Sequence, residues 1–139
     1  MSNPVVIIEK NIPFLSVLRP HARVRFLAPE DITAEAVRDA DALIVRTRTR
    51  CDATLLAGSR VSFVGTATIG TDHIDLPWCA AAGIEVANAP GCNAPAVAQY
   101  VFSSLMRVIN RPLRQYTLGI VGVGHVGSIV ARWARAMEM

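Results

Sequence analysis

The chain has 139 residues, of which 52% are hydrophobic and 18% are charged, and this length corresponds to about one domain. Such a composition supplies enough apolar surface for a buried core and excludes an intrinsically disordered protein. The formal net charge of +3 comes from mixed charges without a basic helix, so we expect no nucleic-acid partner. No apolar stretch is long enough to cross a bilayer, and we expect neither a signal peptide nor a membrane span.

The three cysteines, Cys51, Cys79 and Cys92, form no C-x-x-C pair and no cluster with histidines. This pattern favours neither a zinc site nor a disulfide framework, and it fits the reducing cytoplasm. Cys79 lies in an Ala-rich helical segment and is expected in the core. Cys92 lies in a loop, with no neighbouring base that would mark it as a nucleophile.

Short β-branched runs alternate with Ala-rich or amphipathic stretches along the chain. Because several of these runs are continuous apolar segments of about four residues, they are typical of strands buried on both faces. Three residue patterns mark starts of the intervening helices: Thr33 can cap the first, Asp52 or Thr54 can start the second, and Asp75 or Pro77 can open the third. The alternation predicts an α/β fold with a mainly parallel sheet. The predicted strands are residues 5–8, 23–26, 42–45, 61–64, 84–86 and 118–121.

A longer amphipathic helix is predicted after the loop 88–93, because apolar residues recur at helical spacing from Ala96 to Ile109. Asn93 is the expected N-cap. The loop contains Asn, Pro and Gly and separates a complete α/β unit from the remainder of the chain. We therefore predict one domain over residues 1–90 and a second over 91–139.

Residues 118–127 form a short apolar run that leads into the pattern G-x-G-x-x-G, and a helix is expected after it. In this pattern Gly122 makes the tight turn, Gly124 lets the backbone approach a pyrophosphate, and Gly127 allows close packing of the helix. The amides of the helix N-terminus face the anion. The motif therefore predicts a dinucleotide site. The alternative is a glycine-rich turn that binds nothing.

The usual partner of this motif is an acidic residue about 20 positions further on, which holds the ribose hydroxyls. Only twelve residues follow Gly127, and the one acid among them, Glu138, lies in the expected helix. The second strand of the unit is therefore missing, and these residues do not decide between NAD and NADP.

Two further segments follow predicted strands and carry polar groups. The loop 65–75 offers hydroxyls and free amides at a strand's carboxyl end, where open α/β sheets bind ligands. The alternative is a tight turn in which the hydroxyls cap local groups. Residues 46–50, Arg-Thr-Arg-Thr-Arg, place three arginines on one face if the strand continues. For Arg48 and Arg50 a solvated basic edge is the favoured interpretation.

The order of these features resembles the N-terminal part of the NAD-dependent D-2-hydroxyacid dehydrogenases, over nearly the whole chain. The resemblance implies a near-complete, flavodoxin-like, parallel-sheet substrate domain over 1–90. The first βα unit of an incomplete Rossmann NAD-binding domain would follow over 91–139. It also implies a cytoplasmic, homodimeric enzyme in the full-length form. Three segments resemble family members whose substrate is a small phosphorylated 2-hydroxyacid: Phe-Val-Gly-Thr-Ala-Thr-Ile-Gly-Thr-Asp-His (63–73), Ala-Pro-Gly-Cys-Asn-Ala (89–94) and Tyr-Val-Phe-Ser-Ser-Leu (100–105).

The resemblance also assigns roles to single residues. Thr47 stands where the family has a substrate-contacting serine, Thr68 aligns with a substrate-binding threonine, and the amide of Gly70 lies where the substrate carboxylate is held. The cofactor-binding residues would be Gly122, Gly124, His125, Val126 and Gly127. The chain departs from the family pattern at Lys10, where an acid is usual, and at Gln99, where a glutamate is frequent.

The family's catalytic Arg, Glu and His are expected beyond Met139, so the resemblance implies that these 139 residues alone are inactive. Apolar residues of the second domain would then lack covering strands, which predicts exposed apolar surface and a tendency to associate. Two alternatives stay open. One is another D-2-hydroxyacid dehydrogenase, such as one acting on 3-phosphoglycerate. The other is a non-catalytic binding module.

Overall fold

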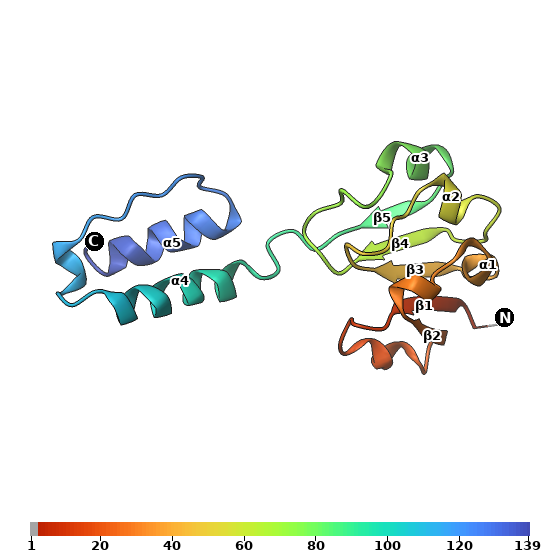
Figure 1. Cartoon of the computed structure of the whole chain (residues 1–139), viewed down its shortest axis with the longest axis horizontal. Coiled ribbons are helices and arrows are strands. Elements are labelled where there is room, and N and C mark those ends of the chain that lie inside the picture. Colours follow the sequence, from red (N-terminus) through yellow and green to blue (C-terminus); the bar gives the residue numbers. More distant parts are fainter. Residues whose placement is uncertain (1–2) are drawn as a thin grey trace. The chain divides into compact units, whose positions relative to one another are not determined.

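The computed structural model describes residues 3–139, and the chain separates into two compact units, Met1–Pro90 and Gly91–Met139 (Figure 1). The division falls within the loop 88–93. That the first unit binds substrate and the second binds cofactor remains a prediction.

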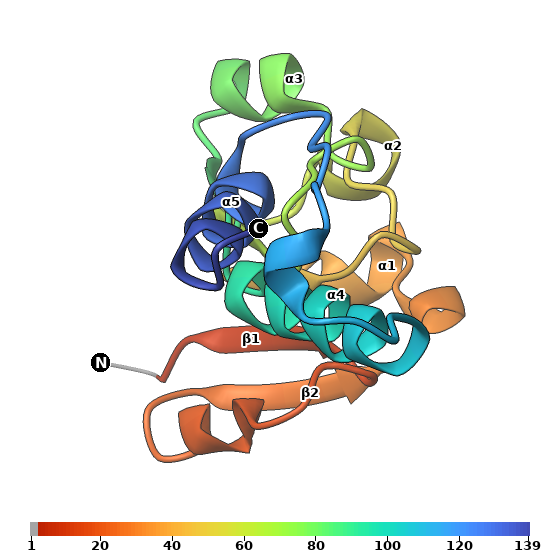
Figure 2. The ribbon, with the colours of Figure 1, turned by 90° about the vertical axis from the view of Figure 1, so that its left-hand side faces the viewer.

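The first unit is built on a sheet of five parallel strands in the order β2-β1-β3-β4-β5. This is the flavodoxin-like order, in which the strand order reverses between β1 and β3. β1 and β2 lie side by side with Val5 opposite Arg23 (Figure 2). The predicted α/β class with a parallel sheet is confirmed. The strands are β1 (Val5–Glu9), β2 (Arg23–Leu27), β3 (Ala42–Val45), β4 (Phe63–Thr66) and β5 (Glu85–Ala87).

Two strands begin later than their hydrophobic runs predicted. Val61 and Ile84 are buried, yet both precede their strands. The amide of Val61 donates to the Ser59 hydroxyl, and the amide of Ile84 donates to the Cys79 carbonyl. Apolar residues predict burial, but ladder hydrogen bonds define a strand, and these two amides are used elsewhere.

Three short helices of this unit begin where capping residues predicted. The side chains of Thr33, Asp52 and Asp75 each accept a hydrogen bond from an amide in the first helical turn, which confirms the cap at Thr33 and decides for Asp52 over Thr54 and for Asp75 over Pro77. The helices are α1 (Ala34–Val37), α2 (Ala53–Leu56) and α3 (Leu76–Ala81), with 3-10 turns η1 (Leu15–Leu18) and η2 (Pro29–Asp31).

Side chains alternate across the sheet and build two cores. Leu43 and Val45 of β3 pack in the core that includes residues of α1, α2 and α3, among them the buried Cys79. Ala42 and Ile44 of the same strand pack on the opposite face, against a core that includes Leu15 and Leu18 of η1. The helices α1, α2 and α3 contribute residues to the first core, whereas the 3-10 turn η1 packs against the second.

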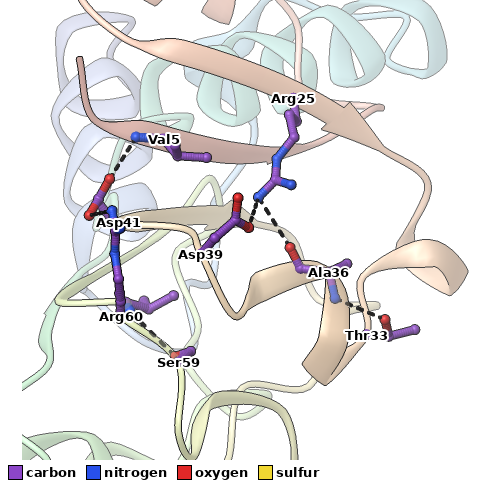
Figure 3. A network of polar contacts seen from close by, with 9 residues as sticks. Val5, Arg25, Thr33, Ala36, Asp39, Asp41, Ser59 and Arg60 are labelled. Carbon is purple, nitrogen blue, oxygen red and sulfur yellow. Dashed lines mark hydrogen bonds and ion pairs between the residues drawn. The ribbon is translucent and has the colours of Figure 1, made fainter. Parts of the chain in front are cut away.

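Polar contacts tie the amino ends of the strands together (Figure 3). The Asp41 carboxylate accepts the Val5 amide at 2.7 Å and the Arg60 guanidinium at 2.6 Å. The hydrogen bond from the Val5 amide, and then the one from Arg60, holds the pKa of Asp41 below its ordinary value. Arg25 donates to Asp39 at 2.6 Å and to the Ala36 carbonyl at 3.2 Å, which connects β2 to α1.

The second unit consists mainly of two packed helices, α4 (Ala94–Val108) and α5 (His125–Ala136), with a 3-10 turn η3 (Leu113–Gln115) between them. Phe102 lies with its ring centroid 5.8 Å from that of Trp133, at an interplanar angle of 49°. Ala98, Val130 and Ala134 complete the buried core of this unit. No helix within residues 3–139 is both long and apolar enough to cross a membrane.

The strand predicted over 118–121 does not form, which corrects the sequence-based expectation. A strand is stabilised by ladder hydrogen bonds, and the described part of this unit supplies no second strand to pair with. Val121 and Val123 are exposed as a result, as are Tyr100 and Val108 of α4. Asn93 occupies the N-cap position of α4, but its side chain makes no capping hydrogen bond.

Replacing Asp41 by Asn is expected to destabilise the first unit at pH 7, and this destabilisation should shrink as the pH falls below 3.8. The folded pKa of Asp41 lies below its ordinary value of 3.8, so the carboxylate stabilises the fold above that pH. This contribution disappears as the pH falls through the lowered folded pKa. Urea midpoints, followed by Trp78 fluorescence in a Trp133→Phe background, measure it. Asp31→Asn, at an exposed carboxylate, is the control, and a pH-independent effect of Asp41→Asn would contradict the argument.

Candidate substrate and cofactor sites

The candidate substrate-binding segments all follow the carboxyl ends of strands. Residues 46–50 follow β3, the loop 67–75 follows β4, and Asn88 follows β5. Because the strands are parallel, these ends meet at one edge of the sheet, which is where open α/β sheets bind ligands.

A backbone bridge between Cys51 and Ile74 joins the first two segments. The Cys51 amide donates to the His73 carbonyl at 2.8 Å, and the Asp75 amide donates to the Cys51 carbonyl at 2.8 Å. The two segments consequently line one shallow hollow. Its lining residues are Thr47, Arg50, Gly70, Asp72 and His73.

The structure brings two of the three predicted substrate residues into this hollow. Thr47 and Gly70 line it, whereas Thr68 does not, because its hydroxyl donates to the Gly70 carbonyl at 3.1 Å within the loop. The sequence allowed the loop hydroxyls either to contact a ligand or to bond to groups within the loop. The Thr68 hydroxyl bonds to a group within the loop. The binding roles of these residues remain predictions.

Strand β3 ends at Val45, as predicted, so the condition under which the three arginines would share a strand face is not met. The Thr49 amide donates to the Arg46 carbonyl at 3.3 Å, so the chain turns directly after the strand. The arginines therefore share no strand face. Arg48 is exposed and lies 4.0 Å from Glu30, in agreement with a solvated basic edge. Arg50 instead donates to Asp52 at 2.8 Å and lines the hollow.

A buried carboxylate, Glu9, holds this turn, and sequence reasoning missed it. Glu9 is only 1% exposed. Its Oε2 accepts the Arg46 amide and the Thr49 hydroxyl, both at 2.9 Å, on either side of Thr47. The signal was present in the sequence, because a glutamate that ends a wholly buried strand needs donors from another segment.

The electrostatics of the hollow combine both signs of charge. Arg50 supplies a guanidinium and Asp72 a carboxylate. Burial lowers the pKa of His73, while the nearby charges of Asp72 and Glu9 act in the opposite direction.

Burial raises the pKa of the Cys51 thiol to about 12, so this cysteine is not a nucleophile at neutral pH. Cys92 is exposed, as expected of its loop. Within residues 3–139, no three His, Cys, Asp or Glu side chains come together as a metal site.

In the second unit, the glycine motif forms the turn that precedes α5. Gly122 has φ +91°, which favours glycine, and a Cβ on Gly127 would overlap the Gly122 carbonyl oxygen. The turn and the helix therefore approach as closely as the motif requires. Nothing lies within 4 Å of the position that a Cβ on Gly124 would occupy.

The N-terminus of α5 is suited to an anion. The helix begins at His125, and its first intrahelical bond runs from the Ser128 amide to the Gly124 carbonyl at 2.9 Å. The amides of His125, Val126 and Gly127 therefore have no acceptor within the helix. The N-cap Gly124 has no side chain to occupy them, and the first turn carries no acidic residue. This backbone geometry fits the pyrophosphate of a dinucleotide.

Residues 5–125 match the sequence profile described as D-isomer specific 2-hydroxyacid dehydrogenase, catalytic domain. The chain belongs to the D-isomer-specific 2-hydroxyacid dehydrogenase family. Among curated family members, it is 51% identical over 137 residues to the erythronate-4-phosphate dehydrogenase of Bacteroides fragilis (strain ATCC 25285), covering 95% of this chain and 39% of that protein. It is also 51% identical over 133 residues to the erythronate-4-phosphate dehydrogenase of Chromohalobacter salexigens, covering 91% of this chain and 34% of the relative. The chain thus spans less than half the length of these relatives.

Solved structures of the family show the same fold. D-lactate dehydrogenase from Aquifex aeolicus, in complex with NAD and lactic acid, matches with a TM-score of 0.76 at 22% identity, over 97% of this chain and 49% of the other. D-2-hydroxyisocaproate dehydrogenase matches with a TM-score of 0.77 at 16% identity, over 96% of this chain and 51% of the other.

Replacing Glu9 by Ala is expected to destabilise the first unit by about 1–3 kcal/mol, because a backbone amide and a buried hydroxyl lose their acceptor. Urea unfolding followed by Trp78 fluorescence measures this loss. Glu9→Gln keeps the chain length and an acceptor oxygen, so it should retain most of the stability. Glu35→Gln, at an exposed glutamate of α1, is the charge control. Equal effects of Glu9→Ala and Glu35→Gln would contradict the role of Glu9.

Replacing Gly127 by Ala is expected to destabilise the second unit by about 1–3 kcal/mol, because the added methyl group meets the Gly122 carbonyl. Gly124→Ala is the matched control, since its Cβ meets open space and its φ of −81° suits any residue. Thermal unfolding, followed by Trp133 fluorescence in a Trp78→Phe background, separates the two. If Gly124→Ala is as harmful as Gly127→Ala, the close approach is not what selects glycine here.

Proposed function

We propose that the chain is part of an NAD-dependent erythronate-4-phosphate dehydrogenase. The enzyme would oxidise 4-phospho-D-erythronate to 2-oxo-3-hydroxy-4-phosphobutanoate, a step of pyridoxal phosphate (vitamin B6) biosynthesis. The observation that carries this proposal is the 51% identity, over 95% of this chain, to a relative with that activity in its name. The same activity is named for relatives from Chromohalobacter salexigens and Klebsiella pneumoniae, at 51% and 46% identity.

In this proposal the hollow of the first unit receives the substrate. Gly70 and Thr47 line it, and the Gly70 amide and the Thr47 hydroxyl would supply donors for the carboxylate. Arg50 lines the same hollow, and its guanidinium is suited to a carboxylate or phosphate. Thr68 would act from within the loop, by holding the Gly70 carbonyl. Arg50 and Asp72 carry opposite charges in the same hollow. This arrangement favours the binding of one small anion in a fixed orientation over the non-specific attraction of anions.

The second unit would hold the pyrophosphate of NAD with the residues Gly122, Gly124, His125, Val126 and Gly127. The three free amides at the start of α5 face the anion, and the glycines keep the turn clear of side chains. The His125 ring packs closely against Gly91. A Cβ on Gly91 would lie only 2.6 Å from Cδ2 of His125, so a larger residue at position 91 would displace the ring. When bound, NAD would supply the acceptor for the hydride that leaves C2 of the substrate, and the hydroxyl proton would pass to a base.

We further propose that the Arg, Glu and His of the family perform the proton chemistry from residues beyond Met139. The complete enzyme would be a cytoplasmic homodimer. Exposed apolar side chains on α4, namely Tyr100, Met106 and Val108, support association of this unit with other protein surface.

The complete protein is expected to reduce NAD⁺ in the presence of 4-phospho-D-erythronate, whereas the 139-residue chain alone is expected to show no turnover. Absorbance at the NADH band measures both. Thr47→Val should lower kcat/KM roughly ten- to hundredfold, because it removes one hydrogen bond to a charged group.

Thr54→Val, at an exposed threonine of α2, is the matched control. Turnover of 3-phosphoglycerate but not of 4-phospho-D-erythronate would reject the proposed substrate and keep the family chemistry. Hydride transfer by the 139-residue chain would show that no further residues are needed.

A further inference from the structure

The loop after β4 contains a chain of hydrogen bonds whose direction can be worked out. The Thr68 hydroxyl lies 3.1 Å from the Gly70 carbonyl oxygen, which can only accept. The single hydroxyl proton of Thr68 is therefore used there. The hydroxyls of Thr66 and Thr68 are 2.6 Å apart, so Thr66 must be the donor between them.

The same proton count assigns the tautomer of His73. Nε2 of His73 lies 3.0 Å from the Thr66 hydroxyl, whose only proton already points to Thr68. Nε2 must consequently carry a hydrogen and donate it. The chain of donors thus runs one way, from His73 through Thr66 and Thr68 to the Gly70 carbonyl, and it leaves Nδ1 without a proton in the neutral ring.

A second contact acts on the neighbouring peptide unit. The Asn88 side-chain amide donates to the Ile69 carbonyl at 2.7 Å. In a trans peptide, the C=O of one residue and the N–H of the next point in opposite directions, and this chain has no cis peptide among its described residues. Holding the Ile69 carbonyl therefore aims the Gly70 N–H away from Asn88. Holding the Gly70 carbonyl aims the Thr71 N–H in the same manner.

These two amides are available to a ligand. Among residues 3–139, neither the Gly70 N–H nor the Thr71 N–H donates to a protein acceptor. The segment that carries them is also anchored at the Thr68 carbonyl, which accepts the Ala89 amide at 3.1 Å. Gly70 is exposed and lines the hollow, so its amide, held in a set direction, is suited to donate to an anion.

We propose that His73 and Asn88 are positioning residues for the Gly70 amide. His73 would act as the Nε2–H tautomer through Thr66 and Thr68, and Asn88 would act through the Ile69 carbonyl. Their consequence for catalysis rests on the proposed function, in which the Gly70 amide receives the substrate carboxylate.

The surroundings of His73 agree with this role. Burial lowers its pKa, so the ring is neutral at neutral pH. Asp72 and Glu9 are the carboxylates that act on it, and Arg50 lines the same hollow. Protonation would add a hydrogen at Nδ1 and leave Nε2–H in place, so the donor chain persists whether the ring is charged or neutral.

The first test is independent of enzyme activity. In the 139-residue chain, ¹⁵N NMR of the imidazole nitrogens should show His73 with a protonated Nε2 and an unprotonated Nδ1 at pH 8. The chain has only two other histidines, His21 and His125, and His21→Gln and His125→Gln identify their signals. Thr66→Val removes the acceptor of the Nε2–H group and should lower the population of this tautomer to that of a free imidazole. A His73 in the Nδ1–H form would overturn the proposal.

The second test separates positioning from chemistry. The variant Asn88→Ala should shift the Gly70 amide resonance of the 139-residue chain, whereas Asn11→Ala, at an exposed asparagine, should not. In the complete enzyme, Asn88→Ala should raise KM for 4-phospho-D-erythronate about tenfold, with a much smaller change in kcat. His73→Gln, which keeps a side-chain donor, should retain more substrate affinity than His73→Ala.

These outcomes keep the two proposals apart. Absence of 4-phosphoerythronate oxidation, with the Nε2–H tautomer and the Gly70 shift both observed, would reject the proposed function and retain the positioning of the amide. An unchanged Gly70 resonance and unchanged KM in Asn88→Ala, or equal KM values for His73→Gln and His73→Ala, would reject the positioning roles.

Discussion

Parallel pairing of the strands is the constraint on which the first unit depends. Because β1, β3, β4 and β5 all run in one direction, their carboxyl ends meet at one edge, and each end is followed by a segment with polar groups. The Cys51–Ile74 bridge then draws two of these segments together. Thr47 and Gly70, 23 positions apart in the chain, consequently line the same hollow. At the opposite edge, Asp41 joins the start of β1 to Arg60 and so closes the amino ends.

Polar groups buried at the carboxyl edge must find partners, and this requirement shapes the candidate site. Glu9 and Thr66 are almost fully buried at the ends of their strands. Leaving either without a hydrogen bond would cost about 1–3 kcal/mol. Glu9 is satisfied by the turn that carries Thr47, and Thr66 by His73 and Thr68. The contacts that satisfy the core are therefore the ones that shape the surface facing a ligand.

The second unit follows a different principle, because two helices rather than a sheet hold it together. Phe102 and Trp133 pack between α4 and α5, while the segment predicted as a strand has nothing to pair with among the described residues. The glycine turn nevertheless adopts its compact form, since the contact between Gly127 and the Gly122 carbonyl is local. A local motif can form beside an incomplete sheet, whereas a strand needs a neighbour.

Much of this protein was determined by the sequence alone, where the determinants are local. Capping by Thr33, Asp52 and Asp75 depends on residues within one helical turn, and the alternation of apolar runs indicated the parallel α/β sheet. The glycine pattern likewise marked the turn before α5. Tertiary structure alone decided which buried residues enter the ladder, as Val61 and Ile84 show. It also decided that Glu9 holds the Thr47 turn and that His73, Thr66 and Thr68 form one donor chain. These contacts join groups up to 40 positions apart, and a periodicity within one segment carries no information about the partner that another segment supplies.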